Sequence, residues 1–335
     1  EILEAIRSGE ARLVIGTHAL FQEDVVFRDL ALTVIDEQHK FGVHQRLSLS
    51  AKGAGGDMLV MTATPIPRTL SLTYYGDMES SRIDELPPGR KPVATRVVPN
   101  ARLDDVAAAL NRALAEGSKV YWVCPLVEEN EKLDLAAAEE RYEYLQKQFG
   151  SRVGLVHGRM KASDKDDVMR RFSAGQIDIL VATTVIEVGV DDPDATVMVI
   201  EHAERFGLAQ LHQLRGRIGR GEKPSSCLLM YAPPLTETAK ARLKVMRETQ
   251  DGFEIAEEDL TLRGAGELLG TRQSGMPEFK IADLSVHGDL LKMAGNDARY
   301  VMNIDADQPS ERGKALRLLL YLFGKDEAVK TLRSG

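Results

Sequence analysis

The segment LALTVIDEQH, residues 30–39, decides the fold of this chain. Its first six residues are almost all apolar, which predicts a fully buried strand of a parallel sheet. The strand ends at two adjacent carboxylates, Asp36 and Glu37. Ligands of open α/β sheets gather at such strand ends. We therefore interpret this strand end as the functional edge of the sheet.

The two carboxylates suit phosphoryl chemistry. One carboxylate can hold Mg²⁺ through its water shell, and its neighbour can orient and deprotonate an attacking water. We assign Asp36 to the metal and Glu37 to the water, with Gln38 and His39 under the phosphates. The alternative interpretation of so short a motif is a polar junction between a strand and a helix, with Asp36 as the helix N-cap.

Length and composition limit the possible classes of protein. The chain has 335 residues with 43% hydrophobic content, enough for two domains and a small third one. No apolar run approaches the ~20 residues of a membrane span, and the first residues are not typical of a secretory signal. Because Glu1 is not a methionine, we expect a piece of a longer protein.

The two cysteines, Cys124 and Cys227, lie in strand-like apolar runs. This position predicts buried thiols in a reducing cytosol and no metal site.

The net charge of −8 taken alone argues against a nucleic-acid partner. One window differs, because residues 205–247 hold nine basic and two acidic side chains, which leaves +7. The basic residues are Arg205, Arg215, Arg217, Arg220, Lys223, Lys240, Arg242, Lys244 and Arg247, and the acidic ones are Glu222 and Glu237. Local charge governs contact with a polyanion, so this window is the expected site of such contact.

Strand and helix signals alternate over residues 1–90. Besides the strand at 30–35, short apolar strands are predicted at 13–16 and 58–61, and a helix begins near a proline after the last of these. The small polar residues that follow these two strands include Thr17 and His18, and Thr62 and Thr64. This pattern predicts half of a doubly wound sheet.

A linker rich in proline and glycine, residues 86–92, precedes a second α/β series. The predicted strands of this series are 95–98, 120–123, 153–156, 177–182, 197–200 and 227–230, and its predicted helices are 103–115, 135–148 and 163–172. Two sheets joined by a short linker should leave a cleft between them.

The segment ATTVIEVGVD, residues 182–191, suits a phosphate ligand. Thr183 and Thr184 follow a predicted strand, where hydroxyls can bind backbone phosphates, and Gly189 allows a ligand to approach the main chain. The alternative interpretation is a strand followed by a glycine turn.

The segment QLRGRIGR, residues 213–220, places Arg217 and Arg220 three residues apart. On a helix these side chains would share one face, beside glycines that keep the surface low, and this arrangement suits a phosphate. The alternative interpretation is ordinary surface charge.

Five segments in this order resemble helicase superfamily 2. They are GTHAL (16–20), DEQH (36–39), TATPIPRT (62–69), ATTVIEVGVD (182–191) and QLRGRIGR (213–220). More narrowly, DEQHKFGVHQR (36–46), the linker IDELPPGRKP (83–92) and the region after Arg220 resemble the bacterial RecG-type DNA translocases. The resemblance implies two RecA-like lobes, the first incomplete at its N-terminus, and then a helical hairpin region. The divisions fall at 1–92, 93–232 and 233–335.

The resemblance also implies roles for the matching residues, with ATP and Mg²⁺ as cofactors. Asp36 and Glu37 match the Walker B carboxylates, and Arg217 and Arg220 match arginine fingers that reach the γ-phosphate from the second lobe. Implied for ATP binding or coupling are Gln38, His39, Thr62, Thr64, Gly189, Asp191 and Gln213. Implied for DNA binding or translocation are Thr17, His18, Thr183, Thr184, Arg263 and Gln273.

Arg263 and Gln273 belong to the segment LTLRGAGELLGTRQ, residues 260–273, which resembles the translocation hairpin of the family. A competing interpretation of these two residues is helix capping and surface polarity. A dinucleotide fingerprint is rejected for this segment, because its spacing is G-x-G-x-x-x-G and no hydrophobic strand precedes it.

The pattern G-x-x-x-x-G-K-[ST] of a phosphate loop does not occur in the sequence. A family member would carry this loop, and a domain that grips a DNA fork, upstream of Glu1. We therefore expect the chain alone to bind ATP poorly and to hydrolyse almost none.

The implied function is ATP-driven translocation on double-stranded DNA, which regresses stalled forks and branch-migrates junctions. The implied partners are branched DNA, such as forks and Holliday junctions, and single-stranded-DNA-binding protein, for a monomer in the bacterial cytoplasm with no membrane contact. One alternative is a transcription-repair coupling translocase, although DEQH replaces its D-E-E-Q. The other is a non-catalytic nucleic-acid-binding module.

Overall fold

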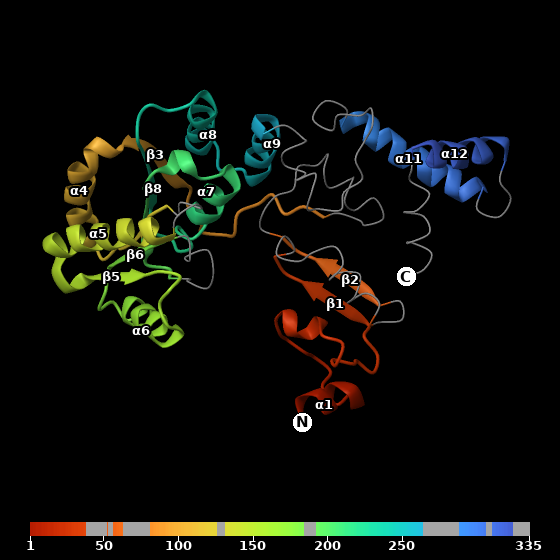
Figure 1. Ribbon diagram of the computed structural model, residues 1–335, viewed down its shortest axis with the longest axis horizontal. Coiled ribbons are helices and arrows are strands. Elements are labelled where there is room, and N and C mark those ends of the chain that lie inside the picture. Colours follow the sequence, from red (N-terminus) through yellow and green to blue (C-terminus); the bar gives the residue numbers. More distant parts are fainter. Residues whose placement is uncertain are drawn as a thin grey trace. The chain divides into compact units, whose positions relative to one another are not determined.

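The computed structural model (Figure 1) describes residues 1–37, 52, 56–62, 81–125, 131–183, 192–263, 288–305 and 310–323. The chain divides into two compact units, one formed by Glu1–Glu79 with Arg263–Gly335 and the other by Ser80–Leu262. The second unit thus takes in residues 80–92 and 233–262, which the expected divisions assigned to neighbouring parts. As a division by function, the boundaries at 92/93 and 232/233 stay a prediction.

The second unit is built on a six-stranded parallel sheet in the order β3-β8-β7-β4-β6-β5. Its strands are β3 (Val93–Pro99), β4 (Lys119–Val123), β5 (Val153–Val156), β6 (Ile179–Ala182), β7 (Ala195–Ile200) and β8 (Ser225–Tyr231). Every strand predicted for this part of the chain is present, with bounds that differ by at most two residues. Continuous apolar runs identify such strands well, because strands with helices on both faces are buried on both faces.

Helices cover both faces of this sheet (Figure 1). They are α4 (Leu103–Ala115), α5 (Glu131–Phe149), α6 (Ala162–Ser173), α7 (Leu208–Arg215), α8 (Glu237–Glu248) and α9 (Gly252–Arg263). One core contains Leu110 of α4 and Leu145 of α5. The opposite core contains Phe172 of α6, Leu211 of α7 and Met246 of α8. The helices after β8 therefore pack on the same sheet as the helices before it.

The central strand β4 supplies alternate side chains to the two cores. Val120 and Trp122 belong to the core with α4 and α5, whereas Tyr121 and Val123 belong to the opposite core. All four side chains are fully buried. Burying side chains of this kind stabilises a fold by about 1.5–3 kcal/mol each.

The cysteines also lie in these two cores. Cys124 and Cys227 are free and buried, which confirms the predicted buried thiols. Burial raises the pKa of the Cys227 thiol to about 12. At neutral pH this thiol is therefore protonated and unreactive.

Among its described residues, the first unit contains one parallel pair of strands, β1 (Leu32–Ile35) and β2 (Asp57–Val60). The predicted strand is confirmed, but its expected full burial is wrong. Ile35 is buried, whereas Leu32 is 56% and Val34 is 52% exposed. A parallel strand is buried only where other elements cover both of its faces, and the described residues leave these two side chains uncovered.

The strand predicted at 13–16 is not formed. Leu13 is 81% and Ile15 is 88% exposed, and no strand among the described residues pairs with this segment. An apolar tetrapeptide becomes a strand only where a neighbour supplies hydrogen-bond partners. The other elements of this unit are α1 (Ile2–Ser8), η1 (His18–Phe21), α11 (Gly288–Asp305) and α12 (Glu311–Leu322). Across the described parts of the chain, no helix is both long and apolar enough to cross a membrane.

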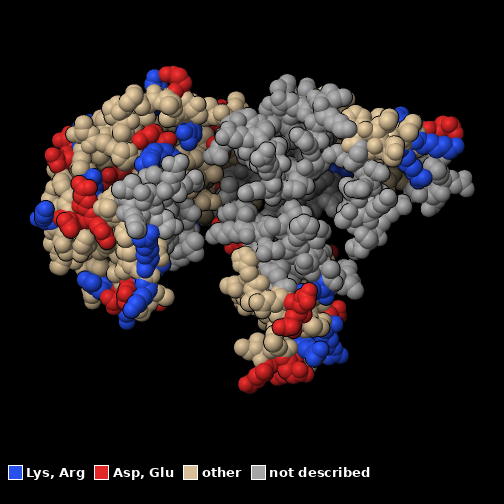
Figure 2. Space-filling model, in the orientation of Figure 1, with Lys and Arg blue, Asp and Glu red and all other residues tan. Residues whose placement is uncertain are grey.

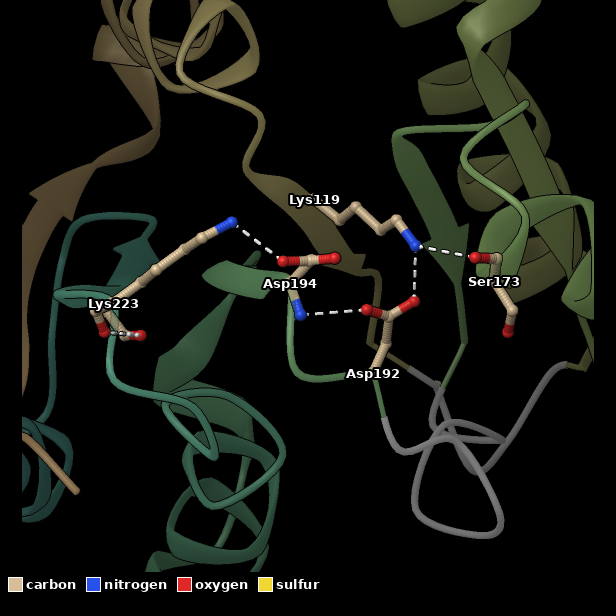
Figure 3. A network of polar contacts seen from close by, with 6 residues as sticks. Lys119, Ser173, Asp192, Asp194 and Lys223 are labelled. Carbon is tan, nitrogen blue, oxygen red and sulfur yellow. Dashed lines mark hydrogen bonds and ion pairs between the residues drawn. The ribbon is translucent and has the colours of Figure 1, made fainter. Parts of the chain in front are cut away.

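Buried and partly buried charges hold the segment that enters β7 (Figure 3). The Lys119 ammonium, at the amino end of β4, donates to Asp192 Oδ2 at 2.6 Å and to the Ser173 carbonyl at 3.1 Å. Asp192 Oδ1 accepts a hydrogen bond from the Asp194 amide at 2.9 Å. A hydrogen bond from Lys223 lowers the pKa of Asp194. This network holds Asp192 and Asp194 in place, directly before β7 begins.

Replacing Lys119 by methionine should destabilise the second unit by about 3–5 kcal/mol, because the buried Asp192 carboxylate loses its counter-charge. Urea unfolding followed by the fluorescence of Trp122, the only tryptophan in the sequence, measures this loss. Adding Asp192→Asn should recover part of the stability, since the amide keeps an acceptor for Asp194 without the charge. The exposed ion pair of Lys240 with Glu237 provides the control. Lys240→Met should cost less than about 1 kcal/mol, and an equal loss in both single variants would contradict the assignment.

Candidate nucleotide and DNA site

Asp36 and Glu37 form a tight turn at the carboxyl end of β1. Asp36 is exposed, and its Oδ1 accepts a hydrogen bond from the Glu37 amide at 2.9 Å. Glu37 has a left-handed backbone with φ 52°. Such a conformation is uncommon for residues other than glycine and is found preferentially at functional sites. The turn thus presents one exposed and one half-buried carboxylate at a strand end.

The position of this turn fits a hydrated divalent cation. Mg²⁺ is usually held by one or two carboxylates and the substrate phosphates while it keeps several waters. Asp36 has the exposure that this mode requires. Among the described residues, no cluster of three or more His, Cys, Asp or Glu side chains could enclose a cation by itself. The donor set therefore suits a metal bound together with a nucleotide.

Thr62 lies at the same sheet edge as the carboxylates. The register pairs Ile35 with Val60, and the Met61 amide donates to the Ile35 carbonyl at 2.8 Å. Asp36 and Glu37 therefore leave β1 at the level where Met61 and Thr62 leave β2. The structure brings these predicted residues together as the parallel pairing requires.

The segment with Thr17 and His18 is exposed and leads into η1. Lys52 holds the carbonyls that follow it, donating to the carbonyl oxygens of Leu20, Gln22 and Val25. The sequence analysis missed Lys52. The sequence around Lys52 gives no sign of this role, because the role depends on contacts with residues about thirty positions away in the chain.

Arg217 and Arg220 do not lie on a helix, so the expected shared helical face is wrong. α7 ends at Arg215, and the chain continues as a turn through residues 216–220, which we call the arginine loop. The Arg217 amide donates to the Leu214 carbonyl at 3.0 Å and the Ile218 amide to the Arg215 carbonyl at 3.3 Å, as in a tightening helix end. Arg220 Nε donates to the Gly216 carbonyl at 3.3 Å.

The arginine loop is nevertheless held firmly in the second unit. Ile218, between the two arginines, is fully buried. Gly219 has φ 68°, and a Cβ there would lie 2.9 Å from Val93 Cγ2, so no other residue fits without strain. Arg90 Nε donates to the Gly219 carbonyl at 3.1 Å. The loop therefore presents Arg217 and Arg220 from an anchored backbone.

Thr183 lies at the carboxyl end of β6, as predicted, but is only 2% exposed. Its hydroxyl makes no hydrogen bond with the described residues. In this conformation the hydroxyl is not accessible to a DNA phosphate. Its expected DNA contact stays a prediction.

Several expected site residues lie outside the described residues, so their expected roles stay predictions. They are Gln38, His39, Thr64, Thr184, Gly189, Asp191 and Gln273, together with the side chain of Arg263, whose backbone ends α9. Gln213 is described and lies half-buried on α7.

The basic window 205–247 is neutralised in part by its neighbours. Arg215 is buried, and Arg242 donates to the Phe206 carbonyl at 2.7 Å. Ion pairs join Lys223 to Asp194, Lys240 to Glu237, and Lys244 and Arg247 to Glu248. On the face shown in Figure 2, basic and acidic side chains of the described residues are interspersed. The count of +7 along the sequence therefore overstates the charge that a polyanion would meet.

A buried carboxylate, Glu201, follows β7 and was also missed by the sequence analysis. Its Oε1 accepts hydrogen bonds from Trp122 Nε1 and Arg141 Nε, and its Oε2 accepts one from Arg141 at 3.1 Å. This cluster ties α5 to the carboxyl edge of the sheet. In the sequence, a glutamate at a strand end cannot be distinguished from an ordinary polar turn residue, because its role depends on its tertiary partners.

His212 lies beside the buried guanidinium of Arg215. Arg215 Nη2 is 3.3 Å from His212 Nδ1. Burial, and then the charge of Arg215, lower the pKa of His212 to about 4. The imidazole is therefore neutral at pH 7, and its Nδ1 can accept a hydrogen bond from Arg215.

Two family models match the chain. The helicase conserved C-terminal domain matches residues 103–222, and the C-terminal part of domain 3 of ATP-dependent DNA helicase RecG matches residues 249–319. The RecG of Pasteurella multocida (strain Pm70) is 52% identical over 321 residues, which cover 94% of this chain and 46% of that protein. The RecG of Escherichia coli (strain K12) is 56% identical over 287 residues, covering 84% of this chain and 41% of that protein.

The chain belongs to the RecG family. A solved structure of RecG bound to a three-way DNA junction matches with a TM-score of 0.65 and 47% identity, over 87% of this chain and 37% of that one. The RecG match confirms the predicted α/β fold with a RecA-like lobe on a parallel sheet. This RecG-family chain spans about half the length of the curated relatives it matches.

Acidification should destabilise the protein through His212. The unfolded chain protonates this imidazole near its ordinary pKa of about 6.5, whereas the native pKa is about 4. Between these values the unfolded state binds more protons, so stability rises with pH across this window and is lost as pH falls. The measurement is the urea midpoint of wild type and His212→Gln at pH 7 and at about pH 5. Wild type should lose more stability than His212→Gln, and equal losses would show that His212 does not titrate in this way.

Proposed function

We propose that this chain is part of an ATP-driven translocase on double-stranded DNA, which regresses stalled replication forks and branch-migrates junctions. The observation that carries the proposal is the carboxylate turn at the end of β1, in a chain about half identical to RecG relatives over most of its length. A RecG protein that is 47% identical to this chain has a solved structure bound to a three-way DNA junction, which supports branched DNA as the substrate.

The proposed chemistry gives separate roles to the carboxylates after β1 and to the arginine loop. Asp36 would hold Mg²⁺ through water, and Glu37 would orient and deprotonate the attacking water. Arg217 and Arg220, on the arginine loop, stabilise the charge that develops on the transferred phosphoryl group. Bound ATP with its Mg²⁺ supplies the phosphoanhydride whose hydrolysis drives movement.

The other site residues serve coupling and DNA contact in this proposal. Coupling falls to Gln38, His39, Thr62, Thr64, Gly189, Asp191 and Gln213, and DNA contact or translocation to Thr17, His18, Thr183, Thr184, Arg263 and Gln273. Support comes from Thr62 at the carboxylate edge and from the exposure of Thr17 and His18. We further propose a cytoplasmic monomer that meets single-stranded-DNA-binding protein at forks.

In the full-length protein that carries this chain, Arg217→Ala should lower the DNA-stimulated kcat for ATP hydrolysis by about 10³ to 10⁵. Glu37→Gln should abolish turnover while the protein still binds ATP, because the amide can no longer accept the proton of the attacking water. Arg112→Ala provides the control, since it removes the same charge from an exposed position on α4. A kcat for Arg217→Ala equal to that of Arg112→Ala would refute the role of the arginine loop.

By itself, the 335-residue chain should hydrolyse ATP no faster than its own Glu37→Gln variant, because its sequence holds no phosphate-loop pattern. A phosphate-release assay with and without duplex DNA measures this. Turnover that depends on Glu37 in the isolated chain would show that another segment replaces the phosphate loop.

A further inference from the structure

Residues 17–25 form an irregular segment of the first unit, and the backbone hydrogen bonds within it are local. The Leu20 amide donates to the Thr17 carbonyl at 3.0 Å, and the Val25 amide donates to the Gln22 carbonyl at 3.1 Å. Thr17 is the N-cap of η1, but its side chain makes no capping hydrogen bond. Bonds between residues three apart set the local course of the backbone, but they do not fix the segment against the rest of the unit.

Lys52 supplies a contact from outside this segment. Its ammonium donates to the carbonyl oxygens of Leu20, at 3.4 Å, of Val25, at 2.9 Å, and of Gln22. An ammonium has three N–H donors and no acceptor, so it can serve three converging carbonyls at once. Without a cation between them, the negative ends of these carbonyl dipoles would repel one another. A single side chain therefore holds the second half of the segment together.

The chain that carries Lys52 leads directly into β2. Gly56, four residues further on, lies so close to β1 that a Cβ there would be 2.3 Å from the Leu30 carbonyl oxygen. Only glycine allows backbones to approach in this way. The next amide, of Asp57, donates to the Ala31 carbonyl at 2.8 Å. Lys52 thus connects residues 17–25 to the strand pair that carries the carboxylate turn.

We propose that Lys52 is a positioning residue for DNA binding, whose ammonium fixes residues 17–25 so that Thr17 and His18 can contact the DNA backbone. This inference rests on the proposed function, which assigns DNA contact to these two exposed residues. Both lie at the start of η1, and the first carbonyl that Lys52 holds belongs to Leu20 in the same short helix. Loss of the ammonium would free this helix to shift, so the DNA contacts would weaken although no contact group has been removed.

A direct contact between Lys52 and a DNA phosphate is the rival explanation, and the two explanations predict different effects of charge. In the structure the ammonium is directed at three carbonyls, and two of these hydrogen bonds are partly buried. Arginine would replace lysine well in a phosphate contact, but its planar guanidinium cannot direct three donors at one point. Lys52→Arg therefore separates positioning from direct binding.

The test uses the full-length protein that carries this chain, with ATP and a three-way DNA junction. The variants are Lys52→Met, Lys52→Arg, Thr17→Ala and the double variant of Lys52→Met with Thr17→Ala. Lys147→Met is the control, because it removes the same charge from an exposed position on α5. Each variant is measured for kcat of ATP hydrolysis at saturating DNA, for the DNA concentration that gives half of this rate, and for the dependence of that concentration on salt.

Lys52→Met should raise the half-saturating DNA concentration about tenfold and lower kcat at saturating DNA by less than about threefold. Lys52→Arg should behave like Lys52→Met. The slope of log affinity against log salt should equal that of wild type, because no phosphate contact of a cation is lost. Circular dichroism checks that each variant is folded. If Lys52→Met does not fold, Lys52→Gln takes its place, and a smaller increase is expected because its amide keeps two donors.

The double variant tests whether Lys52 acts through Thr17. Alone, Thr17→Ala should raise the half-saturating DNA concentration about tenfold, because a hydrogen bond to a charged phosphate is lost. Added to Lys52→Met, it should raise that concentration by no more than about a further twofold, since the hydroxyl is already out of position.

Three results would overturn the inference. They are a half-saturating DNA concentration for Lys52→Met equal to that of Lys147→Met, a normal concentration for Lys52→Arg with a salt slope reduced by about 0.9 in Lys52→Met, and fully additive effects of Lys52→Met and Thr17→Ala. Each of these leaves the proposed function intact as long as DNA stimulates the wild-type ATPase. A wild-type ATPase that DNA does not stimulate would refute the proposed function, and this inference with it.

Discussion

Burial of the central strand β4 from both sides is the constraint on which the second unit depends. Its five residues are all buried, and alternate side chains enter two separate cores. A polar group inside either core would lose its hydration without a partner, at a cost of about 1–3 kcal/mol or more. Polar chemistry is therefore confined to the ends of the strands. Because the strands are parallel, all their carboxyl ends lie at one edge of the sheet and all their amino ends at the other.

The buried charges of this unit follow that rule. Lys119 and Asp192 pair at the amino edge, Glu201 pairs with Arg141 at the carboxyl edge, and Arg215 is the last residue of α7. Such pairs contribute little net stability compared with apolar residues, because desolvation offsets the attraction between the charges. Breaking one of them is costly, however. Conformations that move the segment and separate the pair are therefore higher in free energy. In this unit the apolar strands stabilise the sheet, and the buried charges determine where the connecting segments lie.

Apolar runs predicted the second sheet closely. The continuous apolar composition of strands such as 120–123 and 153–156 is enough to indicate that both faces of the strand are buried. The same reasoning overestimated burial at Leu32 and Val34 and predicted a strand at 13–16. In those cases the outcome depends on neighbours that a local pattern does not contain.

The helix predicted through Arg217 and Arg220 was wrong for a related reason. Gly216 and Gly219 were interpreted as leaving room for a ligand, but α7 ends at Arg215, and the left-handed backbone of Gly219 is incompatible with a helix that runs through both arginines. Lys52, Glu201 and Gln250 could not be found from sequence, because each acts through partners dozens of residues away.

An arginine that must meet a developing charge needs its position held within about 0.5 Å, and a loop achieves this only if its backbone is anchored. The arginine loop has three anchors of different kinds: the buried Ile218 side chain, the restricted backbone of Gly219, and the hydrogen bond from Arg90. The last of these comes from the segment before β3, which also pairs with Gln250 through Val93. The position of the arginine loop therefore depends on contacts from the segment before β3 as well as on the loop's own buried residues.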